Sequence, residues 1–160
     1  MKEVNRRDVL RAASGAAALT AAQYSRVKGA NERVKLGVIG CGGRGTFVMN
    51  VFKNNPVDIV AVCDVWETRA ERARATAGAS ARAFGDHRKL LDEAGVDAVL
   101  VATPDHWHAA IAIDALNAGK DVYCEKPLTL KIEEGPLVVK AARIDKRVPT
   151  TSTGRASWRR

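Results

Sequence analysis

Three glycines in the first half of the chain have the spacing of a phosphate-binding turn. Gly40, Gly42 and Gly45 form the pattern G-x-G-x-x-G within "LGVIGCGGRG", residues 36–45. The first glycine permits a tight turn, the second lets the backbone approach a pyrophosphate, and the third lets a helix pack closely on a strand. Unpaired N–H groups at the start of such a helix attract phosphate. Two neighbours complete the candidate loop: Gly43 and Arg44.

A carboxylate stands at the distance where this kind of loop needs one. Asp64 follows Gly45 by nineteen residues, at the end of the next apolar run. There it would accept hydrogen bonds from the adenosine ribose and repel a 2′-phosphate, which favours NAD over NADP. Arg44 and Arg69 are near enough in sequence to keep NADP as the weaker alternative. Trp66 is a candidate contact for adenine or, equally, a packing residue.

The elements that would position these residues follow from alternating apolar runs and helical patterns. Strands are expected at 34–40, 57–64, 81–84, 96–104 and 120–127, and helices at 45–54, 66–78, 86–95, 106–119 and 131–146. The last helix contains Gly135-Pro136, so its start is expected to shift toward Pro136. This alternation is typical of a parallel sheet covered on both faces. The expected fold class is α/β, a Rossmann-type doubly wound parallel sheet. A Rossmann domain with another use remains the alternative.

Two further motifs follow predicted strands, where ligands bind in open parallel sheets. They are "VATPDHWHA", residues 101–109, and "VYCEKPLTL", residues 122–130. With "GVIGCGGRG" before them, they closely resemble the Gfo/Idh/MocA family, named after glucose–fructose oxidoreductase and inositol dehydrogenase. The resemblance covers about residues 34–147 and rests on three motifs in the expected order and spacing.

The resemblance implies roles for individual residues of the last two motifs. Lys126 is the catalytic candidate, near the nicotinamide and the reacting hydroxyl, where an ammonium can bind that hydroxyl and take part in proton transfer. Pro127 is expected in a cis peptide bond or a constrained turn that aims Lys126, and Glu125 is expected to face the cofactor ribose. The residues expected to line the nicotinamide side are Thr103, Pro104 and His108.

Each of these assignments has a plainer alternative. Lys126 would otherwise be a solvated surface lysine. His106 fits the same loop as His108 and, with Trp107, extends the second motif; for either histidine the alternative is a polar residue at a helix start with no ligand role. His87 lies outside any motif and is expected at the surface.

The charge distribution argues against a nucleic-acid partner. The formal net charge is +8, but residues 1–30 carry +4, residues 143–160 carry +5, and residues 31–142 carry −1. A nucleic-acid-binding domain would carry its basic surface on the folded body. The three cysteines, Cys41, Cys63 and Cys124, are far apart without a C-x-x-C pair, so neither a metal site nor a disulfide framework is expected.

Residues 1–30 resemble an export signal of the twin-arginine type. "NRRDVLR", residues 5–11, matches the pattern S/T-R-R-x-F-L-K with departures at Asn5 and Val9, and a fair cleavage sequence follows at 20–22. Its apolar part is too short for a stable membrane span. The expected location is periplasmic; with an amphipathic or unstructured arm instead, it would be cytoplasmic.

The family pattern is lost near the C-terminus. The resemblance implies a further strand of the type V-V-Q-V-G-T-Q, but the chain reads "RVPTTSTGRASWRR" at 147–160. Pro149 removes a backbone donor, so the sixth strand is expected to be missing or ragged and residues 148–160 irregular. The resemblance also implies a second, C-terminal α/β domain, which we expect this chain to lack. Our hypothesis is a truncated family member with an out-of-frame tail; a genuine stand-alone domain is the alternative.

The expected function is therefore the nucleotide-binding domain of an NAD-dependent oxidoreductase acting on a sugar or cyclitol CH–OH group. Little activity is expected from it alone, because the family's second domain supplies most substrate contacts. The alternatives are a fragment of an NAD-dependent glycosidase and a non-catalytic dinucleotide-binding module. Self-association through the family's interface is expected only with that second domain.

Overall fold

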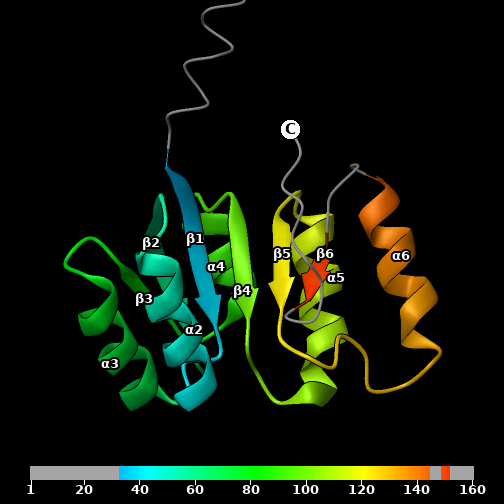
Figure 1. Cartoon of the computed structure of the whole chain (residues 1–160), viewed down its shortest axis with the longest axis horizontal. Coiled ribbons are helices and arrows are strands. Elements are labelled where there is room, and N and C mark those ends of the chain that lie inside the picture. Colours follow the sequence, from blue (N-terminus) through cyan, green and yellow to red (C-terminus); the bar gives the residue numbers. More distant parts are fainter. Residues whose placement is uncertain (1–32, 145–148, 152–160) are drawn as a thin grey trace, which may run out of the picture. The chain divides into compact units, whose positions relative to one another are not determined.

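The computed structural model describes residues 33–144 and 149–151. Within them lies one parallel sheet with the strand order β3-β2-β1-β4-β5-β6 (Figure 1). The strands are β1 (Val34–Ile39), β2 (Val57–Cys63), β3 (Arg82–Phe84), β4 (Ala98–Val101), β5 (Asp121–Cys124) and β6 (Pro149–Thr151). The helices are α2 (Gly43–Lys53), α3 (Glu67–Ala77), α4 (His87–Glu93), α5 (His108–Asn117) and α6 (Glu134–Ile144), with the 3₁₀ turn η2 (Asp105–Trp107) before α5. The expected α/β class and doubly wound sheet are confirmed.

Helices cover both faces of the sheet, and a separate apolar cluster lies under each set. Side chains of a strand alternate between faces, so β1 sends Leu36 and Val38 to one cluster and Ile39 to the other. The first cluster includes Met49 of α2, and the second includes Leu116 of α5. Because helices shield both faces of the sheet from water, the central strands are continuous apolar runs and do not alternate between apolar and polar residues.

The strand order reverses between β1 and β4, which defines the topological switch point. β1 pairs with β2 on one side and with β4 on the other, all in parallel. The chain continues from β1 into α2 and from β4 into α5, which lie on opposite faces. The carboxyl ends of the strands point to the lower edge of Figure 1, where the loops after β1, β4 and β5 lie. Open parallel sheets bind their ligands at this edge.

The structure differs from expectation at the end of the described chain. Helix α6 begins at Glu134, so Pro136 lies in its first turn, where a missing N–H breaks no intrahelical bond. Part of the region expected to be irregular forms β6, with Pro149 opposite Val122. The proline is tolerated because it is the first residue of an edge strand.

Two other expectations concern the ends of the chain and its relation to membranes. The twin-arginine-like segment 1–30 lies outside the described residues, as do 145–148 and 152–160 of the C-terminal region. None of the helices in the described ranges is both long enough and apolar enough to cross a bilayer.

Candidate functional site

The glycine loop between β1 and α2 contains two glycines that the fold requires, whether or not a ligand is bound. Gly40 has a φ of +91°, and a Cβ there would strike the backbone of Ala102 and Thr103. A Cβ on Gly45 would overlap the carbonyl oxygen of Gly40. Both glycines therefore allow α2 to lie close to the ends of β1 and β4. Sequence reasoning assigned them correctly to the tight turn and the close helix–strand contact.

Gly42 and Gly43 are different, because no atom of the described residues lies within 4 Å of a Cβ built on either. No side chain caps the α2 N-terminus at Gly42, and its first turn holds no acidic residue. The helix therefore presents its partial positive charge and open backbone to this space. This arrangement fits a bound pyrophosphate, for which a glycine at an open position leaves room.

Asp64 connects the glycine loop to the end of β2. Asp64 is 9% exposed; its Oδ2 accepts the Cys41 N–H at 2.9 Å and its Oδ1 accepts the Trp66 N–H at 2.9 Å. Each carboxylate oxygen has a second lone pair, so acceptor capacity remains for ribose hydroxyls. Burial, followed by the charge of Asp64, raises the pKa of the Cys41 thiol to about 12. Asp64 thus positions the loop as well as offering acceptors beside it.

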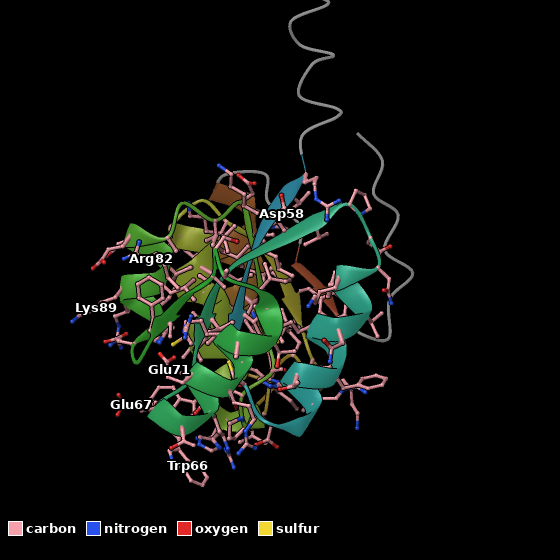
Figure 2. All side chains as sticks on the ribbon, turned by 90° about the vertical axis from the view of Figure 1, so that its left-hand side faces the viewer. Asp58, Trp66, Glu67, Glu71, Arg82 and Lys89 are labelled. Atoms are coloured by element: carbon pink, nitrogen blue, oxygen red, sulfur yellow. The ribbon has the colours of Figure 1, made fainter. Side chains whose placement is uncertain are left out.

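A pocket opens beside Asp64 between α3 and the end of β3. The side chains and backbone lining it are Asp64, Val65, Glu67, Ala70, Glu71, Ala83, Phe84 and Gly85. Figure 2 shows Glu67 and Glu71 on the same side of α3, with Trp66 at the start of that helix. Trp66 is 56% exposed, and the centre of its ring lies 4.6 Å from the guanidinium carbon of Arg69. The lining is negatively charged, which disfavours binding of the 2′-phosphate of NADP there.

Sequence reasoning missed the two glutamates of this pocket. The available signal was their i, i+4 spacing at the start of the helix directly after Asp64, since residues so spaced share a helix face. Glu71 also pairs with the Arg74 Nε at 2.7 Å, whereas no ion pair is found for Glu67 among the described residues. Glu67 is thus the less compensated charge of the two.

Thr103 follows β4 at the switch point and holds an unsatisfied polar atom. Its Oγ1 is buried and has no hydrogen-bond partner within the described part of the chain. Buried hydroxyls are nearly always paired. An orphaned hydroxyl beside the glycine loop fits a polar group of a bound ligand. The following residue, Pro104, is exposed and is the N-cap of η2.

His108 is buried at the start of α5. It is 2% exposed, with Nδ1 2.7 Å from the Pro127 carbonyl oxygen and Nε2 2.8 Å from the Thr103 carbonyl oxygen. Both polar atoms of the ring are thus used by the backbone. The ring joins the loop after β4 to the loop after β5. In contrast, His106 is exposed.

The loop after β5 carries the remaining candidates. Glu125 is 4% exposed and binds Arg44 through two contacts, Nε to Oε2 at 3.1 Å and Nη2 to Oε1 at 3.2 Å. The Lys126–Pro127 peptide bond is cis, so the expectation for Pro127 is confirmed. The Lys126 side chain is exposed at the carboxyl end of β5. Arg44 and Glu125 therefore link the first and third motifs directly.

His87, expected at the surface, is partly buried, with its side chain 13% exposed. Its Nε2 lies 2.9 Å from the Asp114 Oδ2, so it links α4 to α5 away from the candidate site. Within the ranges that the structure covers, no three His, Cys, Asp or Glu side chains gather as metal ligands.

A parallel sheet with this strand order, an uncapped helix behind a glycine loop and polar groups at the switch point defines a dinucleotide-binding domain of the Rossmann type. Residues 34–151 match the Gfo/Idh/MocA model, described as "Oxidoreductase family, NAD-binding Rossmann fold". The chain therefore belongs to the Gfo/Idh/MocA family.

Individual relatives agree with this assignment. The chain is 33% identical over 110 residues to an inositol 2-dehydrogenase of Salmonella paratyphi B, which covers 68% of this chain and 33% of the relative. It is 32% identical over 136 residues to a glycosyl hydrolase family 109 protein of Stenotrophomonas maltophilia, covering 78% of this chain and 30% of the relative.

A solved structure gives the same result. The myo-inositol dehydrogenase of Lactobacillus casei, in complex with NAD(H) and myo-inositol, superposes with a TM-score of 0.70 at 30% identity. The match covers 74% of this chain and 36% of that one. The chain thus spans about a third of the length of these relatives.

Proposed function

We propose that this chain is the NAD-binding domain of an oxidoreductase that acts on a CH–OH group of a sugar or cyclitol. The observation that carries the proposal is the meeting of three loops at one sheet edge. The glycine loop, the Thr103 loop and the Glu125–Pro127 loop are joined there by the Arg44–Glu125 pair and by His108. The inositol dehydrogenases among the relatives support this substrate class.

The residues present fit NAD. Backbone N–H groups of the glycine loop would hold its pyrophosphate, Asp64 its adenosine ribose, and Thr103 and Glu125 its nicotinamide half. When bound, NAD supplies the acceptor for the substrate hydride. Lys126 would bind the reacting hydroxyl through Nζ and, as the free amine, take up its proton.

The preference for NAD over NADP is part of the proposal. The carboxylates of Asp64, Glu67 and Glu71 line one pocket beside the expected ribose position. These carboxylates would repel the 2′-phosphate of NADP. Among the described residues, no cationic side chain lines the same pocket to offset that repulsion. Of the two arginines that kept NADP open, Arg69 lies over the Trp66 ring and Arg44 pairs with Glu125.

Titration of the purified chain with NADH and NADPH, read by calorimetry, tests the proposal. We expect NADH binding, weaker NADPH binding, and little oxidation of inositol or glucose by the chain alone, because it spans about a third of its relatives. The matched variant is G42A, which adds a methyl group only on the open face of the loop and should therefore bind NADH more weakly. Failure to bind NADH, or rapid turnover of a sugar by this chain alone, would contradict the proposal.

A second candidate is the corresponding domain of an NAD-dependent glycosidase. It is favoured by the similarity to a glycosyl hydrolase family 109 protein, which extends over 136 residues. A version of the protein with the full length of its relatives separates the two: a dehydrogenase accumulates NADH with an alcohol substrate, whereas a glycosidase releases an aglycone without net NADH. NADH binding with neither activity in that version would indicate a non-catalytic module.

We also propose that residues 1–30 direct export through the twin-arginine pathway. The support is the "NRRDVLR" sequence at 5–11 followed by a short apolar stretch. A reporter that must fold before export, fused after residue 30, should reach the periplasm. The double variant R6K/R7K is the matched control and should retain the reporter in the cytoplasm. Equal export of both fusions would contradict the proposal.

A further inference from the structure

Trp66 is a half-exposed aromatic residue that belongs to neither apolar cluster of the described chain. It is the N-cap of α3 and is 56% exposed, and the clusters on the two sheet faces are built without it. Val65, directly before it, is 94% exposed. An indole ring outside the core can offer its π-face to a planar ligand. Of the two roles that the sequence left open for Trp66, packing and contact with adenine, the structure therefore favours the second.

Asp64 fixes the position of Trp66 relative to the expected ribose. Its Oδ1 accepts the Trp66 N–H at 2.9 Å, and the same carboxylate is the group expected to bind the adenosine ribose. The base of a nucleoside is joined directly to that ribose, so it must lie close to the start of α3. Figure 2 shows the Trp66 side chain at the lower edge, the edge at which the loops after β1, β4 and β5 lie in Figure 1.

Arg69 covers one face of the indole ring. Its guanidinium carbon lies 4.6 Å from the ring centre, within the range of a cation–π contact. The Arg69 N–H donates to the Trp66 carbonyl oxygen at 2.9 Å, and the spacing of three residues places both side chains on one side of the helix. Within residues 33–144 and 149–151, no carboxylate forms an ion pair with Arg69. The ring is therefore held from one side, and its exposed area lies on the opposite face and the edges.

We propose that the adenine of the dinucleotide stacks on the open face of Trp66, and that Arg69 is a positioning residue that holds the ring from the other face. The three planar groups would then lie in the order guanidinium, indole, adenine. Because Arg69 restrains the ring before the ligand arrives, less side-chain freedom is lost on binding. This assignment rests on the proposed function, since it takes the base from the nucleoside that Asp64 would hold.

Tryptophan fluorescence tests the stack directly. The chain contains three tryptophans, Trp66, Trp107 and Trp158, so in W107F/W158F the indole emission comes from Trp66 alone. We expect ADP-ribose to quench this emission saturably, because a stacked base quenches indole fluorescence. Nicotinamide mononucleotide, which lacks adenine, should leave the emission unchanged. ADP-ribose is the probe because it carries the adenosine half of NAD and, unlike NADH, takes up no excitation energy from tryptophan.

Calorimetric titration with ADP-ribose measures how much the ring contributes. W66L keeps an apolar side chain without a π-face and should bind ADP-ribose about tenfold more weakly, the effect expected when a base loses an aromatic partner. W66F should retain most of the affinity. W107L is the matched control, because Trp107 is also half exposed but follows β4, and it should leave the ADP-ribose affinity unchanged. If a variant at position 66 fails to fold, the quenching in W107F/W158F still decides the question.

The variant R69M separates two roles of Arg69. If Arg69 only positions the ring, R69M should weaken the binding of NADH and NADPH by the same factor, about two- to fivefold, the size of an exposed cation–π contact. The fluorescence anisotropy of Trp66 in the free chain should also fall, because the ring moves more freely. A loss of affinity confined to NADPH would make Arg69 a ligand of the 2′-phosphate and overturn its positioning role.

The outcomes separate the stack from the proposed function. Saturable quenching together with weaker binding by W66L supports the stack. ADP-ribose binding without quenching, or equal affinities of W66L, W66F and the wild type, would overturn the stack and leave NAD binding standing. A wild-type chain that binds neither ADP-ribose nor NADH would contradict the proposed function, and the adenine assignment with it.

Discussion

The guanidinium of Arg44 and the carboxylate of Glu125 face each other in a two-contact ion pair across 81 residues of sequence. Glu125 is buried, with a side chain 5% exposed, whereas the Arg44 side chain is 57% exposed. The pair links the glycine loop after β1 to the loop after β5, the two segments expected to enclose a dinucleotide. Because only one partner is buried, the two residues should respond differently to removal.

Removing Arg44 should cost more stability than neutralising Glu125. R44A leaves a buried carboxylate without its partner, and we expect a loss of about 1–3 kcal/mol in the free energy of unfolding, less than for a fully buried pair because Arg44 is half exposed to solvent. E125Q leaves an exposed guanidinium that water solvates. Urea unfolding of both single variants and the double variant measures the coupling; equal and additive losses would contradict it.

Alanine at Gly42 and at Gly45 should separate binding from folding. A Cβ at Gly45 overlaps the Gly40 carbonyl, so G45A should lose about 1–3 kcal/mol of stability or more. A Cβ at Gly42 meets no atom within 4 Å in the part of the chain that the structure describes, so G42A should fold like the wild type. Its NADH affinity should fall about tenfold, equivalent to about 1.4 kcal/mol, because the methyl occupies the pyrophosphate space. Unchanged NADH affinity in G42A would indicate that the pyrophosphate of NADH does not lie beside Gly42.

Neutralising Glu67 should weaken the discrimination against NADPH. A doubly charged phosphate at ~8 Å from one carboxylate in water is opposed by about 1 kcal/mol, so E67Q should raise NADPH affinity about fivefold at low salt. NADH affinity should change little. E71Q is the matched control and should have a smaller effect, since Arg74 already pairs with Glu71. Calorimetric titrations with both nucleotides check this, and equal effects of the two variants would contradict it.

The three cysteines should be unreactive in the folded chain. Burial raises the pKa of the Cys41, Cys63 and Cys124 thiols to about 12 each, with added repulsion from Asp64 for Cys41. Compared with a free thiol of pKa about 8.5, the thiolate fraction near neutral pH is about a thousandfold lower. Alkylation with iodoacetamide, followed by mass spectrometry, should be very slow in buffer and complete in urea. Rapid native labelling of any of the three would contradict the burial.

Acid should destabilise the chain partly through the start of α4. Asp86 caps this helix by accepting the Arg88 N–H at 2.9 Å, and this hydrogen bond is the main cause of its lowered pKa. A lowered pKa means that the stabilisation is present above the ordinary aspartate range and is lost as the pH falls through the pKa of the folded state.

The D86S variant isolates this titration, because serine also caps helices but does not ionise in this range. Thermal unfolding between about pH 7 and about pH 3 should show a smaller acid-induced loss of stability in D86S than in the wild type. D86A, which lacks a cap, should be less stable than both near neutral pH. Identical pH dependence of D86S and the wild type would exclude a role for the Asp86 carboxylate.

The sequence by itself determined the local features of this protein. Apolar runs and helical spacing predicted the parallel sheet, and the glycines at 40 and 45 predicted the turn, because periodicity and backbone freedom are encoded by neighbouring residues. These features depend on short stretches of chain, so the sequence alone reveals them. The constrained peptide at Lys126–Pro127, in contrast, was implied by the family resemblance and not by a local pattern.

Only the tertiary structure decided which distant groups meet. The pairing of Arg44 with Glu125 and the placement of His108 between two carbonyls depend on which strands are neighbours and how far each loop reaches, which no local pattern specifies. The same holds for β6, where the edge position makes a proline acceptable. Sequence spacing predicted which residues stand at the sheet edge; burial and strand order decided that His108 connects the loops while Lys126 remains exposed.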